Sequence, residues 1–358
     1  MRKTVVLFDV DSKIPNLALM KLSTYYKQQG YAVILSKDIV KCDADLFFAS
    51  AIFNSQKSSE RVQWLKYFYG NNIEIGGSGV ALKKRLSPEI EKCFPDYGLY
   101  NHDKYAIGFL TRGCDNRCKF CLVPEKEGPK RLVATFDDFM LKNQLNVLLL
   151  DDNLLSFQEA KGFLEEMVQR IYAVNFSQSL DITHLNEETF NLLMQVDSRN
   201  SKFTKRMYYF SCNSLVNVEK FYERKVLLKG FGKDAVSVIM MYGFNTHLSE
   251  EYAMLLMFRR IGLIPFMQEY QPIAGVSPMM PEKYFDFDLD KVIGLTFRTN
   301  GQNGEKYLRW LSNHYFNTYG RYYLPLIEKI YRYNNKNALN RYLNKPEILT
   351  NELYKMYK

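Results

Sequence analysis

The sequence lacks a long apolar segment and has few cysteines, and both absences narrow the class of protein. No run of about 18 or more apolar residues occurs, so we expect no membrane-spanning helix. The first residues, MRKTVVLFDVDSK, become polar too soon for a signal peptide. Six cysteines, three of them in one short stretch, do not form the framework of a secreted disulfide-rich protein. We therefore expect a reducing, cytoplasmic location.

The length and charge of the chain set weaker limits. Its 358 residues suggest two domains or one large domain with additions, and 47% hydrophobic residues suffice for a sizeable core. The net charge is +9, and from Gly301 to the end ten Lys and Arg face four Asp and Glu. Eight tyrosines also lie between Tyr319 and Tyr357. Basic and aromatic residues can hold a nucleic acid, but they also form ordinary amphipathic helices, which we favour here.

Three cysteines in the stretch TRGCDNRCKFCLVP give the strongest functional signal. Cys114, Cys118 and Cys121 have the spacing C-x3-C-x2-C. Thiolates select zinc, copper(I) or iron–sulfur clusters. Structural zinc normally has four protein ligands, and the only other His or Cys nearby is His102. A [4Fe–4S] cluster is usually held by four cysteines, so three ligands would leave one iron open for chemistry.

This cysteine stretch, with Phe120 before the last cysteine and Arg112-Gly113 before the first, resembles the cluster loop of the radical SAM superfamily. The resemblance implies a [4Fe–4S] cluster held by the three cysteines. It also implies that the open iron chelates S-adenosylmethionine, which one electron cleaves to methionine and a 5′-deoxyadenosyl radical. An electron donor such as a flavodoxin or a ferredoxin would then be a partner. Phe120 is included among the expected cofactor-binding residues.

Strands and helices alternate along the first hundred residues. Apolar, strand-like runs occupy residues 4–10, 31–35, 45–49 and 72–75, and helical patterns occupy residues 17–29 and 58–68. This alternation predicts a parallel, doubly wound sheet. The strands are almost continuously apolar, which suits burial on both faces.

The same region resembles the cobalamin-binding-type domain that precedes some radical SAM cores. The similar stretches are PNLALMKLSTYYKQQGYAVIL, a turn containing Gly76, Gly77 and Gly79, and FPDYGLY. The resemblance implies a cobalt-ligating His in an Asp-x-His-x-x-Gly pattern, but this chain has DVDSKIP there. We therefore expect a shortened, degenerate domain, with bound cobalamin as the less favoured alternative. The glycines either let a backbone approach a ligand closely or simply form a tight turn.

From Tyr105 the alternation restarts with six strand–helix units. The expected strands are 106–110, 146–150, 176–181, 207–210, 236–242 and 264–270. Their number and spacing resemble the partial (β/α)6 TIM barrel of the radical SAM superfamily. The sequence thus predicts an α/β chain with a Rossmann-like domain at 1–104, the partial barrel at 105–275 and a mainly helical extension at 276–358.

Polar residues at the ends of these strands are the candidates for binding the cofactor. The carboxyl ends of parallel strands meet where such folds keep their active sites. The predicted cofactor-binding residues there are Asp151, Asp152, Asn153, Ser211, Asn213 and Gln268. Further candidates are Asp181, His184 and Tyr270. Asp and Asn also cap helices very often, and we give that alternative equal weight for Asp152 and Asn153.

Cys212 is the candidate catalytic residue outside the cysteine stretch. At the mouth of a barrel its thiol could donate a hydrogen atom to a substrate radical or accept a methyl group. Cysteine is also commonly a small buried residue with no chemical role. Cys42 and Cys93 fall in the first domain, so no second cysteine-rich cluster is expected.

The sequence as a whole predicts a radical SAM enzyme. Its substrate, whether a small molecule, a peptide or a nucleic acid, is not readable from these residues. Two alternatives stay open: a cobalamin-dependent radical SAM methyltransferase, and a non-enzymatic protein that binds zinc and nucleic acid. The six alternating strand–helix units argue against the second alternative, because they predict a barrel, and small metal- or nucleic-acid-binding modules rarely contain one.

Overall fold

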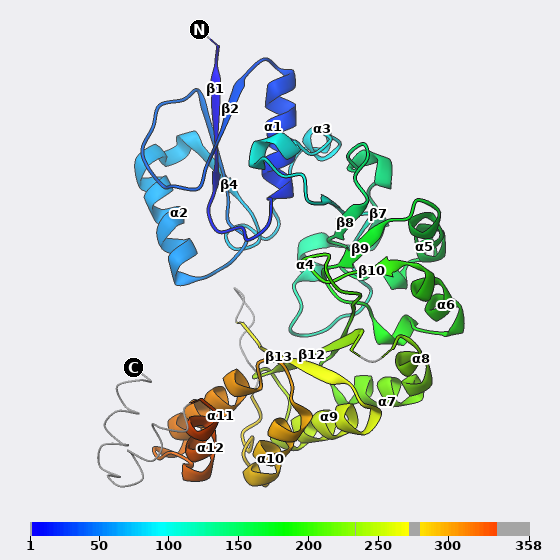
Figure 1. The fold of residues 1–358 in the computed structure, drawn as a ribbon. Coiled ribbons are helices and arrows are strands. Elements are labelled where there is room, and N and C mark those ends of the chain that lie inside the picture. Colours follow the sequence, from blue (N-terminus) through cyan, green and yellow to red (C-terminus); the bar gives the residue numbers. More distant parts are fainter. Residues whose placement is uncertain (1, 233, 272–279, 335–358) are drawn as a thin grey trace. The chain divides into compact units, whose positions relative to one another are not determined.

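The computed structural model describes residues 2–232, 234–271 and 280–334 (Figure 1). The chain divides into two compact units, the first mainly Met1–Tyr209 and the second containing Phe210–Gln271 and the described part of Pro278–Lys358. Both contain sheets whose strands are linked by helices, and the longer strand pairs are parallel, so the predicted α/β class is confirmed. No helix in the described ranges is long and apolar enough to cross a membrane.

The first unit begins with a four-stranded parallel sheet in the order β2-β1-β3-β4. Its elements are β1 (Thr4–Asp9), α1 (Leu17–Gln28), β2 (Ala32–Ser36), β3 (Leu46–Ser50), α2 (Gln56–Tyr69) and β4 (Ile73–Gly76). The short helix α3 (Pro88–Glu91) follows. The predicted strands and helices of this region are confirmed, with small differences at their ends.

Alternate residues of β1 face opposite sides of this sheet, as the pleat requires. Val6 and Phe8 pack in one cluster with Leu65 of α2, and Val5 and Leu7 pack in another with Leu19 of α1. Figure 1 shows α1 and α2 on opposite faces of the sheet. A helix therefore covers each face, which explains why the strands are apolar on both sides.

A second parallel sheet completes the first unit, in the order β10-β9-β8-β5. Its strands are β5 (Ala106–Gly108), β8 (Asn146–Leu149), β9 (Ala173–Phe176) and β10 (Asp197–Ser198), with helices α5 (Ala160–Gln169) and α6 (Glu187–Gln195). Between β5 and β8, the antiparallel pair β6 (Thr111–Arg112) and β7 (Arg131–Leu132) encloses a segment that contains α4 (Val123–Glu127).

The strand predicted at 176–181 was placed wrongly, because β9 is Ala173–Phe176. The polar Asn175 lies inside the strand, where an apolar residue was expected. Its side chain is 3% exposed, and its Nδ2 donates to the Arg199 carbonyl oxygen at 2.7 Å. A buried amide that finds a backbone partner is tolerated in a strand, but the sequence pattern does not show that partner.

The second unit contains a three-stranded sheet in the order β11-β12-β13 and six helices among the described residues. Its elements are β11 (Tyr208–Cys212), α7 (Leu215–Glu223), α8 (Lys225–Gly230), β12 (Val236–Tyr242), α9 (Leu248–Ile261), β13 (Ile264–Glu269), α10 (Leu289–Thr299), α11 (Gly304–Tyr319) and α12 (Leu324–Asn334). Five of the six strands expected after Tyr105 therefore occur at or close to their expected positions, and β9 takes the place of the sixth, within two sheets. Their closure into one partial barrel, and the domain boundaries at 104 and 275, stay predictions. The basic, tyrosine-rich tail falls partly on 335–358, outside the described residues.

A buried carboxylate connects several elements of the second unit. Glu251 of α9 has no exposed surface. It accepts hydrogen bonds from the hydroxyl groups of Tyr307 at 2.5 Å, Tyr284 at 2.6 Å and Thr246 at 2.8 Å. Burial raises the pKa of Glu251 to about 7, although the three donors oppose the shift.

Candidate metal and cofactor site

The three clustered cysteines lie on the segment between β6 and α4. Cys118 is exposed, and Cys114 and Cys121 are half-buried. Burial raises the pKa of Cys118 and Cys121, and the neighbouring thiols raise both values further. Among the described residues, no set of three His, Cys, Asp or Glu side chains is gathered closely enough to hold a metal ion. The three thiols are thus neighbours on one loop, and a metal would have to draw them together and displace their protons.

Backbone amides already point at two of these sulfur atoms. The N–H of Asn116 donates to Cys114 Sγ at 3.4 Å, and the N–H of Val123 donates to Cys121 Sγ at 3.4 Å. Such N–H···S contacts favour the thiolate, the form that binds metals. The chemistry of the donor set therefore fits an iron–sulfur cluster or another thiophilic metal.

Two carboxylates after β8 hold the backbone that enters the cysteine loop. The Asp151 carboxylate accepts from the N–H of Leu110 at 3.2 Å and from the N–H and hydroxyl of Thr111, both at 2.6 Å. The Asp152 carboxylate accepts from the N–H of Gly113 at 3.0 Å. Burial raises the pKa of Asp151 to about 6, although these donors oppose the shift. Both carboxylates therefore accept hydrogen bonds from the backbone that leads into the loop. Their contacts with a cofactor stay a prediction.

Gly113 lets the chain turn directly before Cys114. Its φ is +89°, in the left-handed region that favours glycine. A Cβ at this position would lie 2.9 Å from the carbonyl oxygens of Gly128 and Pro129. A side chain at this position would therefore collide with the loop backbone, which only glycine avoids.

An ion-pair network closes the other end of the loop. The Glu127 side chain, 1% exposed, lies 3.3 Å from Arg112 and also pairs with Lys126 and Arg131. Burial opposes ionisation, but Arg112 and Lys126 outweigh it and lower the pKa of Glu127. The Arg112 guanidinium also lies 4.0 Å from the ring centroid of Phe109. The sequence gives no signal for this network, because Arg112 and Glu127 are 15 positions apart.

A polar chain links the cysteine loop to the ends of β8 and β9. Asn153 Nδ2 donates to Cys114 Sγ at 3.4 Å and to Asp181 Oδ2 at 3.1 Å. Asn116, between the first two cysteines, donates to the same Asp181 oxygen at 2.7 Å. The Oδ1 atom of Asn153 is buried and has no hydrogen-bond partner among the described residues. Asn153 and Asp181 therefore lie at the cysteine loop, and the half-buried Phe120 lies within it.

His184 lies in the first unit, with its Nε2 3.9 Å from Asp181 Oδ2. The remaining predicted site residues belong to the second unit. Cys212 is fully buried, and burial raises the pKa of its thiol to about 12. Asn213 Oδ1 accepts from the N–H of Met241 at 3.2 Å. Ser211 is half-buried on β11, and Gln268 is exposed on β13. A shared site formed by these residues and the cysteine loop stays a prediction.

In the N-terminal sheet, the loops that follow β1 and β3 are joined by hydrogen bonds. Doubly wound sheets bind ligands beyond the strand ends where the strand order reverses, here beside β1 and β3. The Asp11 carboxylate after β1 accepts from the N–H groups of Ile52 at 2.7 Å and Phe53 at 3.0 Å after β3. A Cβ on Gly77 would lie 2.2 Å from the Ala51 carbonyl oxygen. The tight-turn interpretation of this glycine is therefore confirmed.

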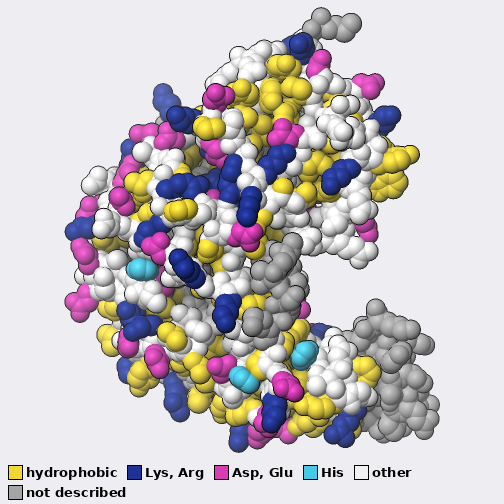
Figure 2. Space-filling model, turned by 180° about the vertical axis from the view of Figure 1, so that it is seen from behind, with side chains coloured by type: hydrophobic (Ala, Val, Ile, Leu, Met, Phe, Trp, Pro, Cys, Tyr) yellow, Lys and Arg dark blue, Asp and Glu magenta, His cyan; other side chains and the backbone are white. Residues whose placement is uncertain are grey.

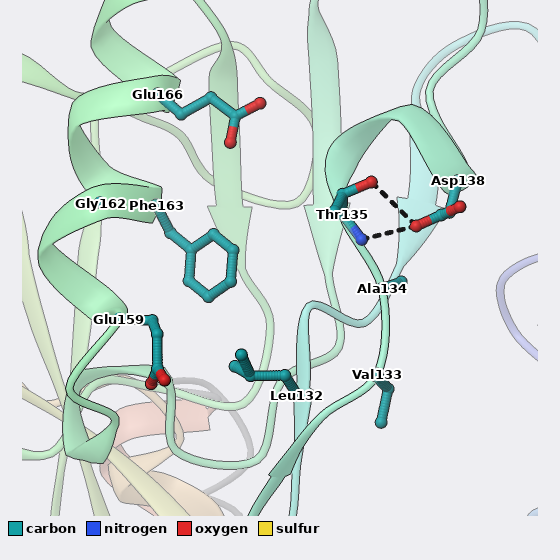
Figure 3. A pocket seen from close by; sticks show the side chains of 9 residues that line it. All are labelled: Leu132, Val133, Ala134, Thr135, Asp138, Glu159, Gly162, Phe163 and Glu166. Atoms are coloured by element: carbon teal, nitrogen blue, oxygen red, sulfur yellow. Dashed lines mark hydrogen bonds between the residues drawn. The ribbon is translucent and has the colours of Figure 1, made fainter.

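A groove of about 680 Å³ lies elsewhere in the first unit, between the segment after β7 and α5. Figure 3 shows Leu132 and Phe163 facing each other across it, with Glu159 and Glu166 on the α5 side. Its lining contains none of the three clustered cysteines and none of the predicted cofactor-binding residues. The groove is therefore separate from the candidate site.

Charge on one face of the molecule is mixed (Figure 2). On the face seen in Figure 2, Lys and Arg side chains lie among Asp and Glu side chains over most of the described surface. The net charge of +9 therefore does not correspond to one continuous basic patch on that face.

Comparison with known proteins gives a partial match. No family model matches the chain. It is 33% identical over 89 residues to the tRNA-2-methylthio-N(6)-dimethylallyladenosine synthase of Flavobacterium psychrophilum, covering 22% of this chain and 18% of the relative. The enzyme of the same name from Christiangramia forsetii is 30% identical over 96 residues, covering 24% and 20%. The chain thus spans about a fifth of the length of these curated relatives, which are radical SAM enzymes.

Solved structures show a weaker likeness. Streptococcus suis SuiB bound to S-adenosylmethionine has 12% identity and a TM-score of 0.36, covering 69% of this chain and 53% of SuiB. SuiB bound to the precursor peptide SuiA has 12% identity and a TM-score of 0.35, covering 57% of this chain and 46% of SuiB. At these TM-scores we base no conclusion about substrate or mechanism on the likeness.

Proposed function

We propose that the chain is a radical SAM enzyme whose Cys114, Cys118 and Cys121 hold a [4Fe–4S] cluster. The observation that carries this proposal is one loop bearing three neighbouring thiols, fixed at both ends by buried carboxylates. When bound, the cluster supplies the electron that cleaves S-adenosylmethionine to methionine and a 5′-deoxyadenosyl radical. The partial match to radical SAM enzymes supports the same proposal.

The residues around the loop would perform two tasks. Asp151 and Asp152 hold the backbone before Cys114 in a fixed turn, which lowers the entropy lost when the three thiolates converge. Asn153 presents a buried, unpartnered Oδ1 beside the cysteine loop, an acceptor that suits the amino group of S-adenosylmethionine. Ser211, Asn213 and Gln268, which lie in the second unit, stay proposed cofactor-binding residues, and Cys212 stays a candidate hydrogen donor.

A product assay tests the proposal. The protein is reconstituted anaerobically with iron and sulfide, reduced, and mixed with S-adenosylmethionine, and 5′-deoxyadenosine is measured by mass spectrometry. Wild type should form the product. Cys118→Ala should form none, and Cys93→Ala, which changes a cysteine outside the cluster loop, should match wild type. Equal product from wild type and Cys118→Ala would contradict the role of the loop.

For the substrate we propose RNA as the class to test first, because the curated relatives carry names of tRNA-modifying enzymes. Methylthio transfer would need a second cluster, cobalamin or an acceptor cysteine. The three cysteines outside the loop, Cys42, Cys93 and Cys212, are far apart in the sequence and show no second cluster motif. Transfer of deuterium between a tRNA pool and 5′-deoxyadenosine would identify an RNA substrate, and no transfer would favour a small molecule or a peptide.

We further propose that residues 1–104 are a shortened relative of cobalamin-binding-type domains and that the region after them forms a partial barrel. The contacts between Asp11 and the loop after β3 favour a domain that holds no cobalamin. A cobalamin-dependent methyltransferase stays the alternative, and a cobalt assay on protein reconstituted with cobalamin separates the two. The zinc-binding alternative predicts about one zinc per chain in place of about four irons.

A further inference from the structure

The Asn153 side chain donates a hydrogen bond to one sulfur atom of the cysteine loop. It leaves the end of β8 and donates from Nδ2 to Cys114 Sγ at 3.4 Å. The residue is only 5% exposed, so water does not compete freely for this hydrogen bond. Asn116 supplies the other N–H donor to the same sulfur, but from its backbone. Asn153 is therefore a donor to Cys114 that a side-chain substitution can remove.

Asp181 fixes which end of the Asn153 amide faces the sulfur. Its Oδ2 accepts from Asn153 Nδ2 at 3.1 Å and from Asn116 Nδ2 at 2.7 Å, while its Oδ1 accepts from the backbone and hydroxyl of Thr183. If the Asn153 amide were flipped, its carbonyl oxygen would face the carboxylate and the two acceptors would repel each other. The NH₂ group is therefore held between the carboxylate and the sulfur.

We propose that Asn153 raises the reduction potential of the cluster bound to Cys114, with Asp181 as the positioning residue. The inference rests on the proposed function, since it assumes a cluster on the loop. The N–H group places partial positive charge beside the thiolate sulfur. Reduction adds one electron to the cluster, so the hydrogen bond stabilises the reduced form more than the oxidised form. Hydrogen bonds to sulfur are one of the means by which proteins set cluster potentials.

The test is a redox titration followed by electron paramagnetic resonance, in the absence of S-adenosylmethionine. Asn153→Leu removes the donor and keeps a similar volume. Its reduction equilibrium should become about tenfold less favourable, which for one electron is about 59 mV more negative than wild type. Asp181→Leu keeps Asn153 but also removes a negative charge beside the loop, which by itself raises the potential, so this variant is used only to test whether the cluster is retained.

Asn175→Leu is the matched control. Asn175 is an equally buried Asn of the same unit, but its Nδ2 donates to the carbonyl oxygen of Arg199. This variant should keep the wild-type potential. A wild-type potential in Asn153→Leu would overturn the inference. So would loss of the cluster in both Asn153→Leu and Asp181→Leu while Asn175→Leu retains it, because these residues would then hold the loop together instead of tuning the cluster. If wild type itself binds no cluster, the proposed function fails instead.

Discussion

Replacing Glu251 by Gln tests whether one buried acid lowers the stability of the second unit as the pH rises. Glu251 has no exposed surface, and its carboxylate accepts from Tyr284, Tyr307 and Thr246. Gln has nearly the same shape. Its carbonyl oxygen can accept from both phenols, and its NH₂ group can donate to the Thr246 hydroxyl. The variant therefore keeps the hydrogen bonds and removes only the titration.

The size of the effect follows from the pKa of Glu251, which burial raises from 4.5 to about 7. The folded chain binds this proton more tightly than the unfolded chain does. The stabilisation is therefore fully present below pH 4.5 and is lost as the pH rises through about 7. A pKa difference of 1 is worth about 1.4 kcal/mol, so the full loss in free energy of unfolding is roughly 3 kcal/mol.

Urea unfolding at pH 5 and pH 8 measures this loss. Trp310 lies 5.8 Å from the Tyr284 ring between centroids, so its fluorescence reports on the region around Glu251. The chain has two tryptophans, and Trp64→Phe removes the other one. Between the two pH values, the chain with Glu251 should lose about 2 to 3 kcal/mol more stability than Glu251→Gln.

The exposed Glu282 in the same unit provides the control. Glu282→Gln removes one carboxylate without changing a buried group, and it should leave the pH dependence as in wild type. If Glu251→Gln and wild type lose equal stability between pH 5 and pH 8, Glu251 does not titrate in this range and the reasoning is wrong.

Three further predictions concern the first unit. Asp151→Ala leaves the buried amide donors of the loop without an acceptor, so the free energy of unfolding should fall by about 1 to 3 kcal/mol in urea unfolding; an unchanged value would contradict its anchoring role. Glu127→Gln removes the charge that pairs with Arg112, so amide hydrogen exchange across the cysteine loop should become faster than in wild type. Equal exchange rates in the two proteins would show that the ion pair does not hold the loop. Gly77→Ala should lower Tm more than Gly30→Ala, because both have positive φ but only Gly77 lacks room for a Cβ; equal losses would exclude the steric cause.

The sequence was sufficient for the N-terminal sheet because its signals are local. Each strand is buried on both faces and is therefore a short apolar run, and the helices between them begin at capping residues such as Asn16 and Ser55. The misplaced third strand after Tyr105 shows the limit. Asn175 is polar and buried, and only its tertiary partner, the Arg199 carbonyl group, explains its place in β9. Two-residue strands such as β6 and β10 carry no periodic pattern that could predict them.

The candidate site, too, could be predicted from the sequence only where its signals are local. The three cysteines were found from the sequence because their spacing is local. The contact between Asn116 and Asp181 joins positions 65 apart, and that between Arg112 and Glu127 joins positions 15 apart, so neither has a sequence signature. Asp151 was predicted as a cofactor-binding residue, and that role stays a prediction; the sequence did not show that its carboxylate also accepts from backbone amides of the loop. Any acceptor at a strand end could perform either role, and only the geometry distinguishes them.

The most direct test of the central claim is the metal content of the anaerobically reconstituted chain, followed by its electron paramagnetic resonance spectrum with and without S-adenosylmethionine. The proposed function predicts about four irons and matching sulfide per chain, and a signal of the reduced cluster that changes when S-adenosylmethionine is added. Cys118→Ala should lose both. About one zinc per chain without sulfide, or a cluster signal that S-adenosylmethionine leaves unchanged, would contradict it.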